Sequence, residues 1–280
     1  MYRIIVAYDG TAYHGWQVQP DQPTVAGELS RRFFEVFGRP VTIIGASRTD
    51  AGVHALGQVA LVKTDLDIDP ERLMRAWNGL LPSDIIIRSI ERIGSAGVVI
   101  SPSDDPESSP RDTFHPQRNV VQKTYWYHIA PVRPLPFMAR YSAYYRFPFD
   151  VQKLQTGLEL FVGTHDFRSF CTGDELATVR TIDRITVEYL KRYGVYRISV
   201  VGAGFARYMI RRLVGAALFV ATRPDLPLTT LTDVLSACDP LHKLPTAPAH
   251  GLLLRRILYS ANPSHTSSAH TFTACTQDGL

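Results

Sequence analysis

The pattern of apolar and polar positions along the chain predicts a mixture of strands and helices. Runs rich in β-branched residues that end at a turn predict strands. Runs whose apolar positions recur three or four residues apart predict helices. The predicted strands are 2–10, 41–45, 53–62, 84–93, 119–130, a hairpin over 180–202 that turns near Gly194, and 251–260. The predicted helices are 23–38, 69–82, 150–163, 205–223 and 229–238.

The order of these elements predicts an α+β chain with two halves. Each half combines long helices with strands joined by short turns, so we expect two mixed, largely antiparallel sheets, each covered by helices. The N-terminal half is residues 1–113 and the C-terminal half is 114–260. Segment 94–113 is rich in Ser, Pro, Asp and Gly, which predicts a flexible loop. The Ser/Thr/His-rich residues 261–280 predict a disordered tail.

Composition and charge exclude several classes of protein. The net charge of +4 is compatible with nucleic-acid binding without requiring it. The three cysteines, Cys171, Cys238 and Cys275, are widely spaced. They predict neither a disulfide framework nor a zinc site and favour the reducing cytoplasm. The sequence contains no secretory signal, no apolar run long enough to span a membrane, and no HExxH, GxGxxG, P-loop or GxSxG motif.

The first candidate site is the turn between strands 41–45 and 53–62. It carries Arg48 and Asp50 among small residues and is framed by apolar strands. One interpretation is an ordinary hairpin turn capped by Asp50 beside a solvated arginine. The other is a functional turn, because rigid apolar flanks support a precise site and small residues allow a ligand to approach closely.

The second candidate is Arg211 in helix 205–223. On a helical wheel it shares a face with Arg207, Val214, Gly215 and Leu218, and this face becomes apolar one turn later. Because buried arginines need partners, Arg211 predicts a nearby carboxylate. The alternative is an arginine that extends to solvent at the edge of the helix. If Arg211 meets Asp50, the cation favours the ionised carboxylate, which can act as a nucleophile or base.

The third candidate is the strand 119–130. Lys123, Tyr125 and Tyr127 share one face, and Thr124, Trp126 and His128 share the other. Alternating aromatic residues in a strand are often simple packing. The functional interpretation is that Lys123 and Tyr125 present a cation and a ring to a nucleotide, since a stacked base contributes about 1–3 kcal/mol.

Taken in order, eight motifs resemble one family, the tRNA pseudouridine synthases of the TruA type. They are "AYDGTAYHGWQVQ", "GASRTDAGVHALGQVA", "NGLLPSDI", "FHP", "KTYWY", "GTHDFRSF", "GFARYMIRRLVG" and "APAHGLLL", between about residues 2 and 259. The resemblance implies the pseudouridine synthase fold, two α+β halves around a central cleft. It also implies a homodimer with a basic surface, a cytoplasmic tRNA-modifying isomerase, and no cofactor or metal. The implied substrates are uridines 38, 39 and 40 in the anticodon stem-loop.

The resemblance also implies a role for individual residues of this chain. Asp50 matches the essential aspartate, and Arg211 the arginine that pairs with it. Arg48 matches an arginine that contacts RNA and helps to hold the target nucleotide out of its stack. Tyr125 matches the tyrosine that packs on the target base, in a basic-x-Tyr-x-Tyr strand that begins at Lys123. Leu252 matches the aliphatic residue that lines the uracil pocket.

Two positions depart from the family pattern. Gln117 stands where the family has an arginine, which weakens the phosphate contact implied there, and Ser47 replaces a glycine. The alternatives for function are a catalytically inactive tRNA-binding relative, and a glycoside hydrolase. The hydrolase would need two paired carboxylates, and the sequence offers one well-placed acid. The sequence also leaves open whether the aspartate attacks C1′ or removes the 2′ proton to form a glycal.

Overall fold

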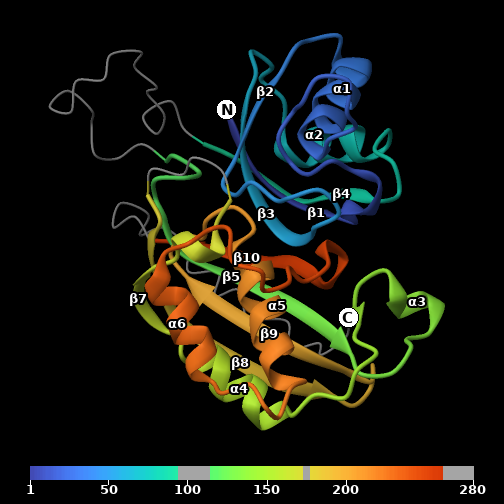
Figure 1. Cartoon of the computed structure of the whole chain (residues 1–280). Coiled ribbons are helices and arrows are strands. Elements are labelled where there is room, and N and C mark those ends of the chain that lie inside the picture. Colours follow the sequence, from blue (N-terminus) through green and yellow to red (C-terminus); the bar gives the residue numbers. More distant parts are fainter. Residues whose placement is uncertain (94–113, 173–176, 261–280) are drawn as a thin grey trace, which may run out of the picture.

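The strands of the described residues form one ten-stranded sheet, whose arrangement Figure 1 shows. The computed structural model describes residues 1–93, 114–172 and 177–260. Along the sheet the strands follow in the order β4 (Ile85–Arg92), β1 (Tyr2–Tyr8), β3 (His54–Lys63), β10 (Leu252–Tyr259), β5 (Val120–Ala130), β9 (Val195–Gly202), β8 (Val179–Leu190) and β7 (Gly163–Asp166). Two short strands lie off this path: β2 (Thr42–Gly45) pairs with β3, and β6 (Ala143–Tyr144) pairs with β5.

The α+β class and the largely antiparallel pairing are confirmed, with one correction to the number of sheets. The two predicted sheets are joined edge to edge, because β10 inserts between β3 and β5. It pairs with β3 in parallel through Leu253 opposite His54 and Leu254 opposite Ala55. The apolar pattern of β10 predicts a strand but carries no information about its neighbours, which are distant in sequence. Strand β10, the last strand in the described residues, therefore joins the strands of the two predicted halves into one sheet.

Helices cover both halves of the sheet (Figure 1). In the N-terminal half, α1 (Val25–Phe37) packs on α2 (Pro70–Asn78), and the ring of Phe33 meets that of Trp77 edge to face. In the C-terminal half, α4 (Val151–Glu159) packs on α5 (Met209–Ala221), which also contacts α6 (Thr229–Ala237). The short helix α3 (Pro136–Ala139) was not predicted, and neither were β6 and β7.

Helix ends follow the sequence signals where those signals are local. The Thr24 hydroxyl accepts a hydrogen bond from the Gly27 amide at the start of α1, and Gly38 ends that helix with φ of 62°. Helix α5 begins at Met209, later than predicted, because Tyr208 adopts a left-handed conformation with φ of 63°. Arg207 therefore precedes the helix instead of sharing its face.

Some predictions fall outside the described residues. They are the flexible loop at 94–113 and the disordered tail at 261–280. The division into halves at residue 113 stays a prediction. Within the described ranges, no helix has the length and apolar character needed to cross a membrane.

Candidate active site

The turn that follows β2 brings Asp50 next to Arg211 in the first turn of α5. Arg211 Nη1 lies 3.4 Å from Asp50 Oδ2. Both side chains are largely buried, with 13% of Arg211 and 16% of Asp50 exposed. The carboxylate that the sequence predicts for Arg211 is thus present, and it comes from the other half of the chain.

The guanidinium of Arg211 is held from two further directions. Its Nε donates to the carbonyl of Ala247 at 2.9 Å, and its Cζ lies 4.8 Å from the centre of the Tyr208 ring. The left-handed conformation of Tyr208 presents this ring to the arginine. Because three neighbours restrain it, Arg211 directs its Nη1 towards Asp50 with little rotational freedom.

Burial and nearby cations act in opposite directions on Asp50. Burial is the larger effect and raises the pKa of its carboxyl above the ordinary value, while the positive charges of Arg211 and Arg207 lower it. The sequence argument that Arg211 favours the ionised form is therefore correct in sign but incomplete. A carboxylate in this setting is poorly solvated and close to a fixed cation, which suits a nucleophile or base.

The turn that carries Asp50 is clamped by the chain that follows β1. The Trp16 amide donates to the Thr49 carbonyl at 3.2 Å, and the Gly52 amide donates to the Tyr13 carbonyl at 3.2 Å. Gly15 adopts φ of +90°, and a Cβ atom there would collide with the Thr49 carbonyl. The close approach of these two backbones therefore depends on glycine.

Ser47 is a point of convergence for three side chains beside the Asp50 turn. Its hydroxyl lies 2.7 Å from the Tyr125 hydroxyl and 3.4 Å from Lys123 Nζ, which also donates to the Ala46 carbonyl at 3.0 Å. The amide of Gln58, fully buried, binds both backbone groups of Ser47. Sequence reasoning missed Gln58, and its only signal was a polar residue at a buried position of an apolar strand.

These contacts change the interpretation of the Lys123 strand. The Lys123 ammonium is turned into the protein towards Ala46, and burial lowers its pKa to about 8. Burial also raises the pKa of the Tyr125 hydroxyl to about 12, and the charge of Asp50 adds to this increase. The Tyr125 phenol is therefore protonated at neutral pH. The sequence prediction that Lys123 presents its cation to a nucleotide is not favoured by this geometry.

The remaining predicted residues lie around this centre. Arg48 is exposed, and within the described part of the chain no hydrogen bond or ion pair engages its guanidinium. Leu252 is 5% exposed and begins β10. Its near neighbour Ala249 approaches Gly52 in the Asp50 turn. Gln117 Nε2 donates to the Gly45 carbonyl at 3.0 Å, so this side chain supports the strand before the turn.

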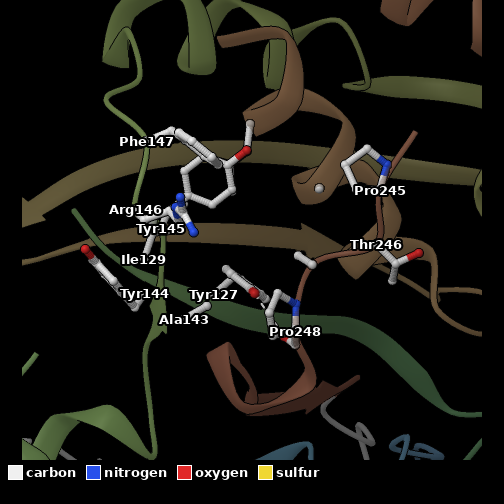
Figure 2. Close-up of a pocket in the computed structure, with 13 residues that line it drawn as sticks. Tyr127, Ile129, Ala143, Tyr144, Tyr145, Arg146, Phe147, Pro245, Thr246 and Pro248 are labelled. Carbon is white, nitrogen blue, oxygen red and sulfur yellow. Dashed lines mark hydrogen bonds between the residues drawn. The ribbon is translucent and has the colours of Figure 1, made fainter. Parts of the chain in front are cut away.

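A separate apolar cavity of about 260 Å³ is lined in part by Gly215 and Leu218 of α5 (Figure 2). It does not include Asp50, Arg211 or Tyr125. The Tyr127 hydroxyl donates to the Pro248 carbonyl at 2.9 Å on one wall of this cavity. The residues around it are Tyr127, Ile129, Ala143, Tyr144, Tyr145, Arg146, Phe147, Gly215, Leu218, Pro245, Thr246, Ala247 and Pro248.

Comparison with known proteins identifies the family. The family model described as "tRNA pseudouridine synthase" matches residues 4–98 and 158–260. A "tRNA pseudouridine synthase A" from Brevibacillus brevis is 36% identical over 261 residues, 92% of this chain and 98% of its own length. One from Thermodesulfovibrio yellowstonii is 31% identical over 268 residues, again 92% of this chain and 98% of its own length.

A solved H/ACA RNP structure with bound substrate RNA is similar over 78% of this chain and 43% of that chain. The TM-score of 0.33 and identity of 10% are too low to support a conclusion. The family model and the full-length relatives are sufficient on their own. This chain belongs to the tRNA pseudouridine synthase family, whose members are RNA-modifying isomerases.

Proposed function

We propose that this enzyme converts uridines 38, 39 and 40 of the tRNA anticodon stem-loop to pseudouridine, with Asp50 as its catalyst. The observation that carries the proposal is the contact between Asp50 and Arg211. It supplies a single, poorly solvated carboxylate beside a fixed cation, in a turn of small residues. The matching motifs around both residues and the family membership support the choice of reaction.

The chemistry explains why this arrangement suits the reaction. The N1–C1′ bond breaks, the uracil turns, and C5 joins C1′ while the C5 proton is lost. The reaction has no net redox change and no hydrolysis, so it requires no redox cofactor. The target uridine must leave its stack, because C1′ is inaccessible inside a helix. Asp50 then attacks C1′ or removes the 2′ proton to form a glycal.

Other residues take supporting roles in this proposal. The Tyr125 ring packs on the target base and Leu252 lines its pocket, so the freed uracil rotates without escaping. Arg211 opposes the effect of burial on Asp50. Arg48, exposed at the turn, contacts the RNA and helps to keep the nucleotide flipped. Lys123 supports the turn from inside the site.

The proposal extends to partners and location. The substrate is tRNA, and the modest positive charge of +4 is compatible with this polyanion. The family resemblance implies a homodimer. A cytoplasmic location is implied by the resemblance and by the small number of widely spaced cysteines. Size measurement in solution by light scattering tests the dimer directly: a mass near 63 kDa, twice the chain mass of 31.3 kDa, is expected.

The proposal is tested by tritium release from a tRNA transcript containing uridine tritiated at C5. Wild type should release tritium, and Asp50→Asn and Asp50→Ala should not. The exposed Asp65 gives a matched control, Asp65→Asn, which should remain active. Transcripts with cytidine at position 38, 39 or 40 then show which uridines react. Full turnover by Asp50→Asn would overturn the assignment of Asp50.

The second candidate function is tRNA binding without catalysis. It keeps the same fold and substrate but predicts tRNA binding with no tritium release from any transcript. The joint presence of Asp50, Arg211, Tyr125 and Leu252 in one region favours the enzyme over this alternative.

A further inference from the structure

The two halves of the sheet meet along a short seam, and a buried histidine lies on it. Strands β3 and β10 pair through only two register positions, one of which is His54 opposite Leu253. The side chain of His54 is almost fully buried, since 4% of the residue is exposed. The roles assigned to Asp50, Arg211 and Tyr125 do not use this side chain.

Both ring nitrogens of His54 are engaged, and each binds a different part of the chain. The Gly10 amide donates to Nδ1 at 3.0 Å, so Nδ1 carries no proton. Nε2 must then carry the proton and donates it to the His250 carbonyl at 3.2 Å. Burial is the largest effect on His54 and lowers its pKa below the ordinary value, although the charge of Asp9 opposes this, so burial favours the neutral ring.

The first partner of His54 belongs to the support of the Asp50 turn. Gly10 packs directly on Val53, and a Cβ atom at Gly10 would collide with the Val53 carbonyl. The Val53 amide in turn donates to the Asp50 carbonyl at 3.1 Å. A shift of Gly10 would therefore be transmitted to the backbone of Asp50 through two short contacts.

The second partner belongs to the segment 247–252, which leads from the Arg211 contact to Leu252. Arg211 Nε binds the carbonyl of Ala247 at one end of this segment, and Tyr127 binds the carbonyl of Pro248. His54 binds the carbonyl of His250, two residues before Leu252. Each of the three side chains thus fixes one carbonyl of the segment.

We propose that His54 is a positioning residue that sets the distance between the Asp50 turn and the Leu252 segment. Its imidazole is a rigid spacer with an acceptor on one edge and a donor on the other. Acting with the Asp50–Arg211 contact, it fixes the two halves of the site across a seam that the short β3–β10 ladder alone would hold weakly. This inference rests on the proposed function, because the distance matters only if both sides contact one uridine.

Charged and titratable neighbours act on the His54 ring in opposite directions: Asp9 and the carbonyls of His250 and Arg140 raise its pKa, whereas the His250 side chain lowers it. Asp9 Oδ1 lies 3.1 Å from Nδ1 and would form an ion pair only with a protonated ring. This carboxylate is already bound by the Thr11 amide and hydroxyl, by the Tyr141 hydroxyl and by Arg140. The Tyr141 ring meets the imidazole edge to face, and the nearby His250 side chain opposes a positive charge on it. The neutral ring with the proton on Nε2 is therefore the state that binds both partners.

Three substitutions separate the two hydrogen bonds. His54→Gln keeps a donor near the His250 carbonyl, His54→Asn keeps an acceptor near the Gly10 amide, and His54→Leu removes both. We expect kcat on tRNA to fall about 10-fold for each polar variant and about 100-fold for His54→Leu, since misplacement by about 1 Å can cost about 100-fold. KM should remain within about twofold.

The buried His128 on β5 provides the matched control. It bonds to the Tyr141 carbonyl and accepts from Arg197, so its loss removes a buried imidazole without touching Gly10 or His250. All variants are assayed at a temperature at which circular dichroism shows them folded. A purely structural role predicts lower melting temperatures for His54 and His128 variants alike, with kcat unchanged. That result would overturn the inference.

A second measurement does not depend on turnover. The nitrogen-15 chemical shifts of the His54 ring should show a neutral imidazole protonated on Nε2 at pH 7. A charged ring or the Nδ1-protonated form would contradict the proposed spacer. If wild type binds tRNA but releases no tritium, the proposed function fails whatever the ring shows. If Asp50→Asn is inactive while the His54 variants keep full kcat, only this inference fails.

Discussion

The guanidinium of Arg211 lies 3.4 Å from the carboxylate of Asp50, although 161 positions separate them along the chain. Asp50 belongs to the turn between β2 and β3, and Arg211 to the first turn of α5. Their contact therefore joins the N-terminal and C-terminal halves at the place where the candidate site is built. It also couples the protonation of Asp50 to the position of a helix.

Replacing Arg211 should shift the pH dependence of the reaction. Burial raises the pKa of Asp50 and Arg211 lowers it, so Arg211→Leu should raise this pKa further. Because fewer molecules then carry the ionised carboxylate at a given pH, the acid limb of kcat/KM should move to higher pH. At pH 7 we expect a loss of about 100-fold. Arg211→Lys keeps the charge, so its acid limb should stay close to that of wild type.

The neighbouring Arg212 controls for general damage to α5. It donates to the carbonyls of Ser169, Cys171 and Pro240 and does not contact Asp50. Arg212→Leu should lower the melting temperature without moving the acid limb. An identical pH profile for Arg211→Leu and wild type would show that Arg211 does not control the ionisation of Asp50.

Lys123 should make the stability of the protein depend on alkaline pH. Burial lowers its pKa to about 8 in the folded protein, against about 10.4 in an unfolded chain. Below pH 8 the folded state bears the cost of the buried charge. As the pH rises from 8 to about 10.4, the folded state loses this proton first, and the cost is relieved. Over this rise in pH, the free energy of unfolding of wild type should increase by about 1–3 kcal/mol relative to that of Lys123→Met.

Urea unfolding of wild type and Lys123→Met at pH 7 and pH 10 measures this difference. The exposed Lys243 supplies the control Lys243→Met, which removes a lysine without emptying an internal position. If the difference in free energy of unfolding between wild type and Lys123→Met stays constant with pH, the Lys123 ammonium is well solvated in the folded protein.

The ring of Tyr125, and not its hydroxyl, should be important for turnover. The hydroxyl is bound by Ser47 at 2.7 Å, and its pKa of about 12 keeps it protonated. Tyr125→Phe should therefore retain kcat/KM within about 10-fold, since one hydrogen bond contributes about 1 kcal/mol. Tyr125→Leu removes the stacking surface and should lose a further 10-fold to 100-fold or so. Tritium release measures both.

A double-mutant cycle with Ser47→Ala isolates the hydroxyl contact. The coupling free energy between Ser47→Ala and Tyr125→Phe, measured by urea unfolding, should be about 0.5–1.5 kcal/mol. If Tyr125→Phe is as inactive as Asp50→Asn, the hydroxyl itself takes part in the chemistry.

Arg48 and Gln117 should differ in their effect on tRNA binding. The guanidinium of Arg48 is exposed, whereas Gln117 Nε2 binds the Gly45 carbonyl. Arg48→Gln should weaken tRNA binding and reduce the slope of log K against log salt by about 1. Gln117→Ala should leave this slope unchanged and lower stability by about 1 kcal/mol. Filter binding at several salt concentrations compares them, and equal slopes for wild type and Arg48→Gln would exclude a phosphate contact by Arg48.

Local signals in the sequence determined many of the elements. Helix α1 begins after Thr24 and ends at Gly38, because a hydroxyl cap and a left-handed glycine act on the nearest backbone groups. The alternation of Lys123, Tyr125 and Tyr127 is an intrinsic property of an extended strand. The family resemblance of the motifs identified Asp50 and Arg211 as partners. The apolar face around Arg211 independently predicted a carboxylate partner for this arginine.

Tertiary structure decided the arrangements that join distant segments. The insertion of β10 beside β3, the engagement of Gln58 with Ser47 and the two hydrogen bonds of His54 all depend on residues far apart in the chain. The sequence predicts that Lys123 presents its cation to a nucleotide, whereas in the structure its ammonium points inward and donates to the Ala46 carbonyl. The periodicity of apolar residues in the sequence predicts which face of a helix or strand is buried. Only the packed structure reports which group that face meets, because the partner's position depends on the whole chain.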